Sequence, residues 1–301
     1  MSSPVVLVFG SNGWIGSKVV KLLEELNVTV ISSKCRANDL NAVENEINSI
    51  SVVTHIMSFI GRTHGIVDGN VIPTIDYLEK PGKLVENIND NLFSPVTLAE
   101  LCKRRNIHFT YLGTGCIFDY DNNHLIGDET SGFTESDLPN FFGSSYSIVK
   151  GYTDRLMHQL YNETALNVRI RMPITDEVNS RNFITKITNY EKVCSIPNSM
   201  TVLNELLPVM INMSLQNKVG TINLTNPGTI THNEILEMYK EIVDPSFTWA
   251  NFTIEEQNQI LASKRSNNCL NTEQLEKYNV RPIKEAVKNV LLQMAANKNQ
   301  I

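Results

Sequence analysis

A tyrosine and a lysine that could together transfer a proton lie four residues apart in the segment YSIVK at 146–150. This spacing places the phenol of Tyr146 and the ammonium of Lys150 on one face of a helix predicted at about 144–160. A phenol has an unperturbed pKa of about 10, so it exchanges protons poorly near neutral pH unless a nearby cation stabilises its anion. Lys150 would supply that cation. The same spacing also occurs on ordinary surface helices, so the interpretation depends on the surrounding elements.

A glycine-rich turn near the N-terminus could hold a dinucleotide. The segment GSNGWIG at 10–16 follows an apolar run at 5–9 and opens an amphipathic stretch at 14–26. Glycine permits a tight turn and close backbone approach, and the start of a helix offers unpaired N–H groups and a positive dipole end to a pyrophosphate. The turn therefore predicts a dinucleotide site. Its expected contacts are Gly10, Asn12, Gly13, Trp14, Ile15 and Gly16.

The end of the second predicted strand indicates which nicotinamide cofactor the turn binds. A site for NAD usually carries an acid there, which binds the ribose 2'-hydroxyl. This chain instead has the segment SSKCR at 32–36, and its hydroxyls and cations suit a 2'-phosphate. We therefore expect Ser33, Lys34 and Arg36 to favour NADP(H) over NAD. The alternative is that both cations are solvated surface residues.

The elements that must position these residues alternate along the first half of the chain. Short β-branched runs at 5–9, 29–31, 52–58 and 107–112 alternate with helical patterns at 14–26, 40–47, 84–104 and 144–160. Such alternation predicts an α/β fold with a doubly wound parallel sheet of the Rossmann type. Thr114 follows the strand at 107–112, at the carboxyl end where such a sheet places ligand-facing groups.

Beyond Pro173 the segments become shorter and mixed, which indicates a smaller lobe. We expect a cofactor-binding Rossmann domain at 1–165 and a mainly substrate-binding lobe at 166–301. Segments around 200–226 are expected to return to the first domain. A cleft between the two lobes would hold the substrate.

Composition and charge exclude several classes of protein. The 301 residues are 42% hydrophobic and 19% charged, which is typical of a globular protein and unlike a disordered one. The net charge of -6 and the absence of basic runs argue against nucleic-acid binding. Five cysteines without paired CxxC spacing indicate free thiols and no metal site. With no signal-peptide pattern or membrane-spanning run, we expect a cytoplasmic protein.

Long segments of the chain resemble one known family. They are GSNGWIG, TGCIF at 114–118, PNFFGSSYSIVKG at 139–151, RIRMPI at 169–174, RNFITKI at 181–187, IPNSMTVLNELLP at 196–208 and NLTNPGTITHNEILEMY at 223–239. These strings are similar to those of the nucleotide-rhamnose synthases. These epimerase/reductases are extended short-chain dehydrogenases related to dTDP-4-dehydrorhamnose reductase. The resemblance implies 3,5-epimerisation and 4-reduction of UDP-4-keto-6-deoxy-glucose to UDP-L-rhamnose with NADPH.

The resemblance also assigns catalytic roles. Thr114, Tyr146 and Lys150 match the reductase triad, in which hydride passes from the nicotinamide to C4, Tyr146 protonates the oxygen and Thr114 holds it. Cys116 and Lys186 match the epimerisation pair. The chemistry is consistent with this, because the C4 ketone acidifies the protons on C3 and C5. One group must remove these protons and another must return them from the opposite face.

Further positions follow from the same resemblance. Asn91, in NDNLFSP, matches the helix asparagine of the superfamily and is expected at the cofactor. The residues implied in binding the nucleotide sugar are Asn182, Arg265, Asn267 and Asn268. The segment 60–81 departs from the family pattern and is expected to border the substrate and cofactor as a loop. A separate 4,6-dehydratase would supply the keto sugar, and a homodimer would be usual for the superfamily.

Two other functions stay open at this point. A reductase that acts on an already epimerised sugar would leave Cys116 as a small buried hydrophobic residue. A noncatalytic regulatory subunit on the same fold would turn over no keto sugar, although the intact Thr114, Tyr146 and Lys150 argue against it. The sequence does not distinguish a UDP from a dTDP sugar, because one methyl group changes discrimination only modestly.

Overall fold

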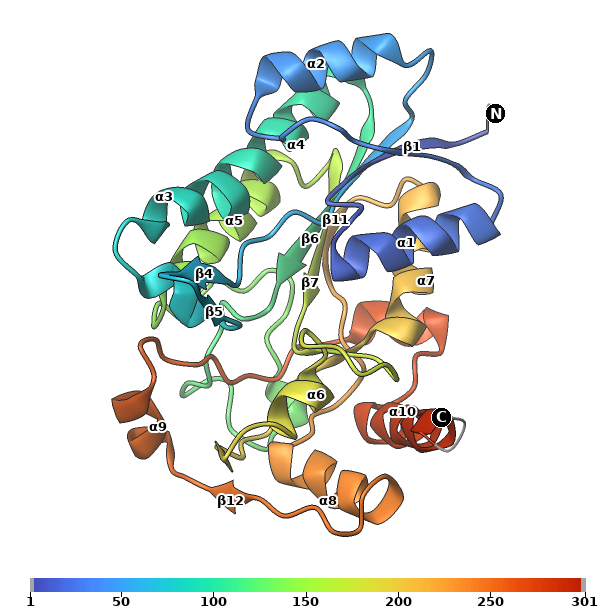
Figure 1. Cartoon of the computed structure of the whole chain (residues 1–301). Coiled ribbons are helices and arrows are strands. Elements are labelled where there is room, and N and C mark those ends of the chain that lie inside the picture. The colour runs from blue at the N-terminus through green and yellow to red at the C-terminus, as the bar shows by residue number, and fades with distance from the viewer. Residues whose placement is uncertain (1–2, 299–301) are drawn as a thin grey trace. The chain divides into compact units, whose positions relative to one another are not determined.

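The computed structural model describes residues 3–298 and contains a six-stranded sheet with the order β11-β7-β6-β3-β1-β2 (Figure 1). The strands are β1 (Val5–Phe9), β2 (Thr29–Ser32), β3 (His55–Ser58), β6 (His108–Thr114), β7 (Ala165–Ile170) and β11 (Gly220–Asn223). β1 pairs in parallel with β2 and β3, and β3 pairs in parallel with β6. The predicted α/β fold with a parallel sheet is confirmed.

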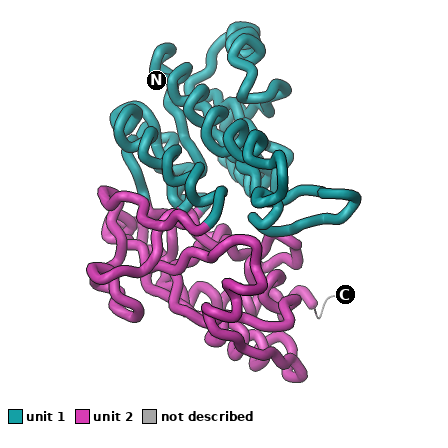
Figure 2. The backbone as a smooth tube through the Cα atoms, turned by 90° about the vertical axis from the view of Figure 1, so that its left-hand side faces the viewer, with its two compact units in different colours: residues 1–114, 144–169, 207–222 teal, residues 115–143, 170–206, 223–301 magenta. Residues whose placement is uncertain are grey.

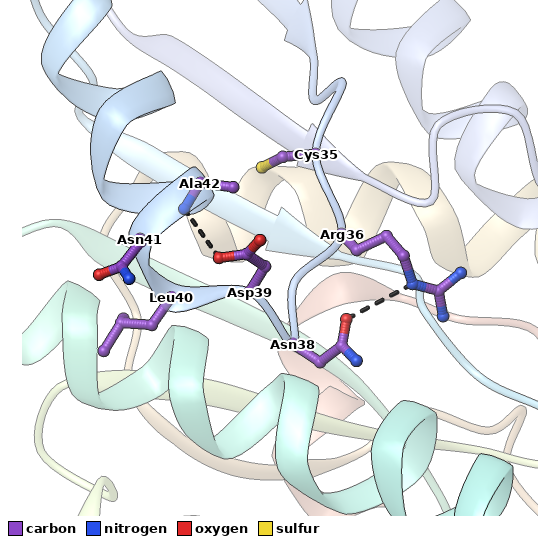
Figure 3. Close-up of a pocket in the computed structure, with 7 residues that line it drawn as sticks. All are labelled: Cys35, Arg36, Asn38, Asp39, Leu40, Asn41 and Ala42. Atoms are coloured by element: carbon purple, nitrogen blue, oxygen red, sulfur yellow. Dashed lines mark hydrogen bonds between the residues drawn. The ribbon is translucent and has the colours of Figure 1, made fainter.

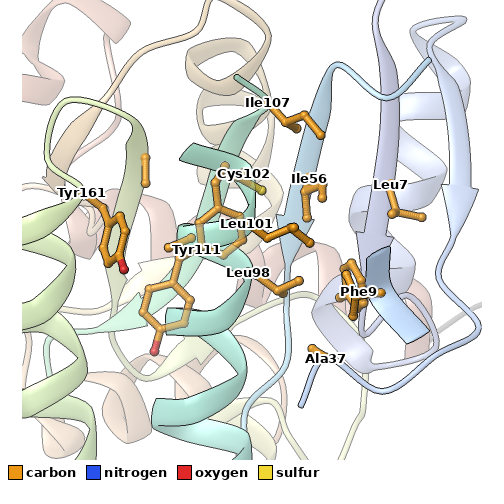
Figure 4. Packing of buried hydrophobic residues seen from close by; sticks show 14 of the residues in the cluster. Leu7, Phe9, Ala37, Ile56, Leu98, Leu101, Cys102, Ile107, Tyr111 and Tyr161 are labelled. Carbon is orange, nitrogen blue, oxygen red and sulfur yellow. The ribbon is translucent and has the colours of Figure 1, made fainter. Parts of the chain in front are cut away.

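Helices cover both faces of this sheet. Figure 1 shows α2 (Leu40–Ser49), α4 (Ser94–Arg105) and α5 (Ser145–Leu160) on one face, and α1 (Trp14–Glu25) and α7 (Leu203–Leu215) on the other. Successive residues of a strand point to opposite faces, so Leu7 and Phe9 of β1 share one face and lie in one buried cluster with Leu98 of α4 (Figure 4). The near-continuous apolar sequence of β1 is therefore the pattern of a strand that is buried on both faces.

The chain folds as two compact units, which Figure 2 shows in two colours. The first consists of residues 1–114, 144–169 and 207–222, and the second of residues 115–143, 170–206 and 223–301. The large sheet belongs almost entirely to the first unit. Residues 115–143 fold with the second unit, although the sequence analysis placed them in the first. Residues 207–222 belong to the first unit and lie within the segment that was expected to return there.

The described part of the second unit contains short strands and several helices. The strand pairs are β8 (Pro173–Ile174) with β10 (Thr201–Val202), and β9 (Lys192–Val193) with β12 (Ala250–Asn251). The helices are α6 (Phe183–Ile187), α8 (His232–Ile242), α9 (Ile254–Ile260) and α10 (Ile283–Lys298). Ile184 of α6, Leu236 of α8 and Val287 of α10 lie in one buried cluster. α6 is thus held by a hydrophobic core of its own unit.

The segment 60–81 forms a hairpin and a short helix. Strands β4 (Gly65–Val67) and β5 (Asn70–Ile72) pair antiparallel around Asp68 and Gly69, which both have positive φ, and a 3-10 helix follows at Ile75–Glu79 before α3 (Lys83–Ile88). A Cβ on Gly65 would lie 2.3 Å from the ring of Tyr77. The hairpin therefore packs closely on Tyr77, and the segment that was expected to be a loop contains two short paired strands.

Two buried histidines face each other near the starts of β3 and β6. The ring centroids of His55 and His108 lie 5.3 Å apart, and His55 Nε2 is buried without a hydrogen-bond partner in the structure. Burial, and secondly the charge of His108, lower the pKa of His55 from 6.5 to about 4. Between these pH values the unfolded chain binds a proton that the folded chain does not. Above about pH 6.5 this titration therefore costs the folded state no stability. As the pH falls from 6.5 toward 4, protonation of His55 in the unfolded chain lowers the free energy of unfolding.

A His55→Leu variant should consequently lose less stability in acid than the wild type. When the pH falls from 7.5 to 5, the free energy of unfolding of the variant should decrease by about 2 kcal/mol less than that of the wild type. Urea unfolding of both proteins at the two pH values measures it. Equal acid destabilisation of variant and wild type would contradict a depressed pKa at His55.

Over residues 3–298 no helix combines the length and apolar character needed to cross a bilayer. Within the same range no group of His, Cys, Asp and Glu is arranged to hold a metal ion.

Candidate active site

Helix α5 presents Tyr146 and Lys150 in its first turns. The helix begins after Ser144, whose hydroxyl caps it by accepting from the backbone N–H of Ser147 at 3.0 Å. Tyr146 is partly exposed, whereas Lys150 is 4% exposed. A buried ammonium needs partners, and Lys150 Nζ donates to the hydroxyl of Tyr111 at 2.5 Å and to the carbonyl of Leu112 at 3.4 Å.

Tyr111 is a functional neighbour that the sequence analysis missed. It lies on β6, three residues before Thr114, and its side chain is fully buried. Burial, and then the charges of Tyr146 and Asp154, raise the pKa of Tyr111 well above its usual value, so this phenol stays neutral. Tyr111 thus fixes the ammonium of Lys150 at β6, near both Tyr146 and the end of the strand that carries Thr114.

A buried ion pair and a hydrogen bond anchor α5 in this register. Asp154 accepts from Arg169 of β7 at 2.7 Å and 2.9 Å, and both side chains are almost completely buried. Thr153 donates to the carbonyl of Asn91 at 2.6 Å. Breaking one side of such a buried pair leaves an uncompensated charge, so the pairing specifies where α5 lies.

Asn91 supports the site in a different way from the one expected. Its side chain is fully buried in a π-helical turn (Asn89–Phe93), where it accepts from the N–H of Arg62 at 3.1 Å and donates to the Arg62 carbonyl at 2.9 Å. It also donates to Asn87 at 2.9 Å. The side chain is therefore committed to holding the chain after β3, and its backbone carbonyl anchors α5. A direct cofactor contact of the Asn91 side chain does not fit this geometry.

The glycine turn has the context that a dinucleotide site requires. Gly10 has a φ of 76°, and the Gly13 N–H donates to the Gly10 carbonyl at 3.0 Å. A Cβ on Gly16 would lie 2.1 Å from the Gly10 carbonyl oxygen, so a larger residue would push α1 away from the turn. α1 has no side-chain cap at Gly13 and no acid in its first turn. Its N-terminus is thus built to accept an anion.

A pocket of about 640 Å³ opens where β2 leads into α2. Figure 3 shows the residues that line it, among them Cys35, Arg36 and Asp39. The side chain of Arg36 is 71% exposed and donates to Asn38 at 3.4 Å and to Asp90 at 3.3 Å. Lys34 is exposed beside it. The pocket therefore offers one accessible cation, Arg36, at the position predicted for the 2'-phosphate, and Lys34 lies two residues before it.

One of the expected 2'-phosphate ligands is engaged by an acid. Glu46 of α2 accepts from the hydroxyl of Ser33 at 2.6 Å and from the N–H of Lys34 at 2.7 Å. Burial acts to raise the pKa of Glu46, but these hydrogen bonds outweigh it and lower the pKa. No acid stands in the segment 32–36 at the end of β2, yet the fold brings the carboxylate of Glu46 to Ser33 from 13 residues away. The hydroxyl of Ser33 is therefore not free for the phosphate.

Cys116 belongs to the second unit and lies two residues after Thr114. It is partly exposed, and the residue before it is tightly fixed. The N–H of Gly115 donates to the Ile170 carbonyl at 3.0 Å, and the Gly115 carbonyl accepts from Asn268 at 3.0 Å and Arg171 at 3.3 Å. The thiol therefore extends from a rigid piece of backbone, which favours a positioned chemical group.

Lys186 lies on the short helix α6 of the same unit. It is half-buried, and burial lowers its pKa, with the nearby charges of Arg181 and Arg265 acting in the same direction. An ammonium with a lowered pKa exchanges its proton more readily near neutral pH than an ordinary lysine. Lys186 thus has the property that a proton donor and acceptor needs.

Two of the four residues predicted to bind substrate have structural positions instead. Asn182 is fully buried, caps α6 by accepting from the Ile184 N–H, and donates to the carbonyls of Thr175 and Glu177. Asn268 is also fully buried and donates to the carbonyls of Gly115 and Phe118. Both ends of the Asn182 amide are used to shape its loop, so the expectation that it faces a ligand needs correction. The Asn268 amide donates within its loop, and its Oδ1 is buried without a hydrogen-bond partner in the structure.

The other two predicted substrate ligands are partly exposed. Arg265 donates to the carbonyl and hydroxyl of Ser263, and the Asn267 amide accepts from Asn198 at 2.9 Å. The Asn267 backbone N–H donates to Asp119 at 2.9 Å. Hydrogen bonds to Ser263 thus hold the guanidinium of Arg265 in place on its loop.

Comparison with known proteins identifies relatives of this chain. The model of the family described as NAD dependent epimerase/dehydratase matches residues 6–177. The chain is 55% identical over 270 residues to protein L780 of Acanthamoeba polyphaga mimivirus, which covers 90% of this chain and 91% of L780. The crystal structure of the L780 UDP-rhamnose synthase superimposes with a TM-score of 0.91 at 52% identity, over 97% of this chain and 100% of the other.

A plant relative matches the chain over a similar length. The bifunctional dTDP-4-dehydrorhamnose 3,5-epimerase/dTDP-4-dehydrorhamnose reductase of Arabidopsis thaliana is 43% identical over 271 residues, which are 90% of this chain and 86% of the relative. A dTDP-4-dehydrorhamnose reductase of Clostridium acetobutylicum shares the fold, with a TM-score of 0.77 at 19% identity over 98% and 99% of the two chains. The family model matches more than half of the chain, and the two relatives at 55% and 43% identity cover nine tenths of it. The chain therefore belongs to the NAD dependent epimerase/dehydratase family.

Proposed function

We propose that the chain is a bifunctional 3,5-epimerase/4-reductase that converts UDP-4-keto-6-deoxy-glucose to UDP-L-rhamnose with NADPH. Its relatives with these activities in their names match nine tenths of the chain. The observation that carries the proposal is that one chain holds two sets of residues. In the first set, Tyr111 fixes Lys150 at β6, and Tyr146 precedes Lys150 on α5. The second set is the partly exposed Cys116 and Lys186, whose pKa is lowered. The first set suits reduction and the second suits epimerisation.

The reduction uses the groups at the end of β6. NADPH, when bound, supplies the hydride that reaches C4. Tyr146 donates its phenolic proton to the oxygen that becomes the 4-hydroxyl, and Lys150 stabilises the resulting phenolate. The hydroxyl of Thr114 donates a hydrogen bond to the same oxygen. Because Tyr111 holds the ammonium, Lys150 stays within reach of the phenol and is not drawn into solvent.

The epimerisation requires one group to take a proton from C3 or C5 and another to return it from the opposite face. We assign these roles to Cys116 and Lys186. The lowered pKa of Lys186 allows it to give up a proton to carbon and to regain one from water at neutral pH. We assign the diphosphate of the substrate to Arg265, because an acidic chain needs a local cation for an anionic ligand.

The residues at the cofactor end fit NADPH. The turn at 10–16 and the N-terminus of α1 would hold the pyrophosphate. Arg36, which lines the pocket, and the exposed Lys34 would hold the 2'-phosphate. Glu46 lies close to the same place, so the two cations must outweigh its charge. We infer a preference for NADPH that depends on these cations and not on Ser33.

An Arg36→Ala variant tests this assignment. Losing one charge-assisted contact with the phosphate should raise the KM for NADPH about tenfold and change the KM for NADH less than about twofold. Initial-rate measurements with each cofactor provide the comparison. Arg104→Ala removes a similarly exposed cation that pairs with Glu44 on the surface and should leave both values unchanged. An equal rise for both cofactors would place Arg36 away from the 2'-phosphate.

We infer two partners. The keto sugar is the product of a 4,6-dehydration, so a dehydratase activity must precede this enzyme. The other partner is a second copy of the chain, since α3 and the turn after it expose Leu84, Val85 and Phe93, each at least half exposed, in one unit. Light scattering after size-exclusion chromatography would give the mass of a dimer if this face is an interface between copies.

The test of the proposed function is the turnover of keto sugars. Purified protein with UDP-4-keto-6-deoxy-glucose should oxidise NADPH and release UDP-rhamnose, and the dTDP sugar run in parallel reports the preference for the base. Turnover only of a sugar supplied in the epimerised form would favour a reductase alone. No oxidation of NADPH with any of these sugars would favour a noncatalytic role.

A further inference from the structure

Three hydrogen bonds converge on Ser145, which is the first residue of α5 and directly precedes Tyr146. The backbone N–H of Ser145 donates to Glu79 Oε1 at 2.7 Å. Its hydroxyl donates to the carbonyl of Leu78 at 3.1 Å and accepts from Asn87 Nδ2 at 3.4 Å. The start of the helix that carries the proton donor is therefore held by groups from an earlier segment of the chain.

The bond to Glu79 satisfies a donor that α5 itself cannot satisfy. The first N–H groups of an α-helix have no carbonyl of the same helix to bind. The hydroxyl of the N-cap, Ser144, accepts from the N–H of Ser147, so the N–H of Ser145 is bound by a group outside the helix. A carboxylate also suits the positive end of the helix dipole. Glu79 thus fixes the first turn of α5 from a separate segment.

The segment that supplies this carboxylate is well packed. Glu79 is the last residue of the 3-10 helix Ile75–Glu79, in which Tyr77 is 3% exposed. The hydroxyl of Tyr77 donates to Glu86 Oε2 of α3 at 2.6 Å, and the hairpin of β4 and β5 packs on its ring. α3 lies in turn beside α5 (Figure 1). The segment 60–81, which departs from the family pattern, therefore holds the carboxylate in place.

A second connection runs from the hydroxyl of Ser145 to the chain after β3. Asn87 is fully buried, and its Oδ1 accepts from Asn91 Nδ2 at 2.9 Å. Asn91 in turn binds the N–H and the carbonyl of Arg62. The hydroxyl of Ser145 thus belongs to a buried amide network, whereas its N–H binds Glu79. The two contacts can be removed separately.

We propose that Glu79 is a positioning residue for the reduction, which aligns the phenol of Tyr146 by holding the N–H of Ser145. The proposal rests on the proposed function. A shift of the first turn moves Tyr146 relative to the C4 oxygen. Lys150 lies one turn further along and keeps its bond to Tyr111, so the shift separates the proton donor from the cation that assists it. A misplacement of about 1 Å at a reacting group can cost about a hundredfold in rate.

Variants at Glu79 test the role of the hydrogen bond. Glu79→Ala should lower kcat for NADPH oxidation with the epimerised keto sugar about tenfold to a hundredfold, and KM should stay within about twofold. Glu79→Gln keeps an oxygen that can accept the same N–H, so its kcat should stay within about threefold of the wild type. Glu100→Ala is the matched control. Glu100 accepts from Tyr161 at the other end of α5, and its loss should leave kcat within about twofold.

Replacing Ser145 breaks the same bond from the side of the helix. Ser145→Pro deletes the N–H, and proline suits the first position of a helix. Ser144 has φ -148° and ψ 152°, which is the extended backbone that a residue before proline adopts. The kcat of Ser145→Pro should fall as in Glu79→Ala, and combining the two should lower it less than about twofold further, because both remove one bond. Ser145→Ala keeps the N–H and measures the effect of losing the hydroxyl.

Hydrogen exchange at single amides gives a readout that needs no substrate. In Glu79→Ala the amide of Ser145 should exchange at least about tenfold faster than in the wild type, while the amides in the last turns of α5 keep their protection. Unchanged exchange at Ser145 would overturn the proposal. So would a folded Glu79→Ala protein whose kcat stays within about twofold of the wild type.

The remaining outcomes separate the hydrogen bond from other causes. Equal losses of kcat in Glu79→Ala and Glu79→Gln would overturn the proposal, because the charge and not the bond would then matter. If Glu79→Ala unfolds, Ser145→Pro compared with Ser145→Ala decides, and equal kcat in these two would overturn the proposal. A wild-type protein that reduces no keto sugar would reject the proposed function, whereas the exchange at Ser145 would still show whether Glu79 fixes the first turn.

Discussion

A Tyr146→Phe protein is expected to oxidise NADPH about a hundredfold to ten-thousandfold more slowly than the wild type, with the keto sugar at saturation. The substitution removes only the hydroxyl, so the ring still packs at the start of α5 and the ammonium of Lys150 keeps its bond to Tyr111. What is lost is the proton that the C4 oxygen must receive as hydride arrives. Stopped-flow or steady-state absorbance of NADPH measures the change in kcat.

The control for this variant is Tyr152→Phe. Tyr152 lies on the same helix, and its side chain is 61% exposed. Its loss of a hydroxyl should leave kcat within about twofold, because surface substitutions rarely change a function that they do not touch. NADPH should bind Tyr146→Phe with nearly the wild-type Kd. A Tyr146→Phe protein that retains a tenth or more of the wild-type kcat would remove Tyr146 from the proton transfer.

Replacing Cys116 with Ser should separate the two activities. A serine hydroxyl is far less acidic than a thiol, so exchange of the C3 and C5 hydrogens with solvent should fall at least about a hundredfold. Reduction of a sugar supplied in the epimerised form should stay within about twofold, because it uses Tyr146, Lys150 and Thr114. Proton NMR in deuterated buffer follows the exchange, and absorbance of NADPH follows the reduction.

The matched control is Cys194→Ser in the same unit. Cys194 is buried, and burial raises the pKa of its thiol, so it is suited to packing and not to proton transfer. This variant should exchange and reduce like the wild type, provided that it folds. If Cys116→Ser keeps full exchange, Cys116 is a structural residue and the enzyme has a different base.

The sequence was sufficient to predict the parts of the fold that repeat a local pattern. The strand β1 is a continuous apolar run and β6 is mostly apolar. The glycine-rich turn is recognised because it lies between a predicted strand and a predicted helix. Gly16 shows why this motif can be recognised in a sequence. A Cβ at this position would collide with the Gly10 carbonyl, so the position requires glycine. The hairpin at 65–72 was not predicted, because an exposed two-stranded hairpin has too few buried residues to leave a periodic pattern.

The polar residues that support the site could not be predicted in the same way. Arg171 follows a buried strand in a segment that reads as structural, and its contacts with Asn198 and Ser266 are 27 and 95 residues away. Glu46 reaches Ser33 only because α2 lies beside the end of β2. A motif gives the residue type at each position, but it does not show whether the side chain is buried or faces a ligand. Asn182 satisfied the motif and is used as a helix cap.

The central claim is that one chain both epimerises and reduces the keto sugar. The measurement that tests it most directly is to incubate the protein with UDP-4-keto-6-deoxy-glucose and NADPH in deuterated buffer and to record the NMR spectrum of the product. UDP-L-rhamnose that carries deuterium at both C3 and C5 is the predicted result. A 4-reduced sugar without label at these carbons, or no product at all, would contradict the claim.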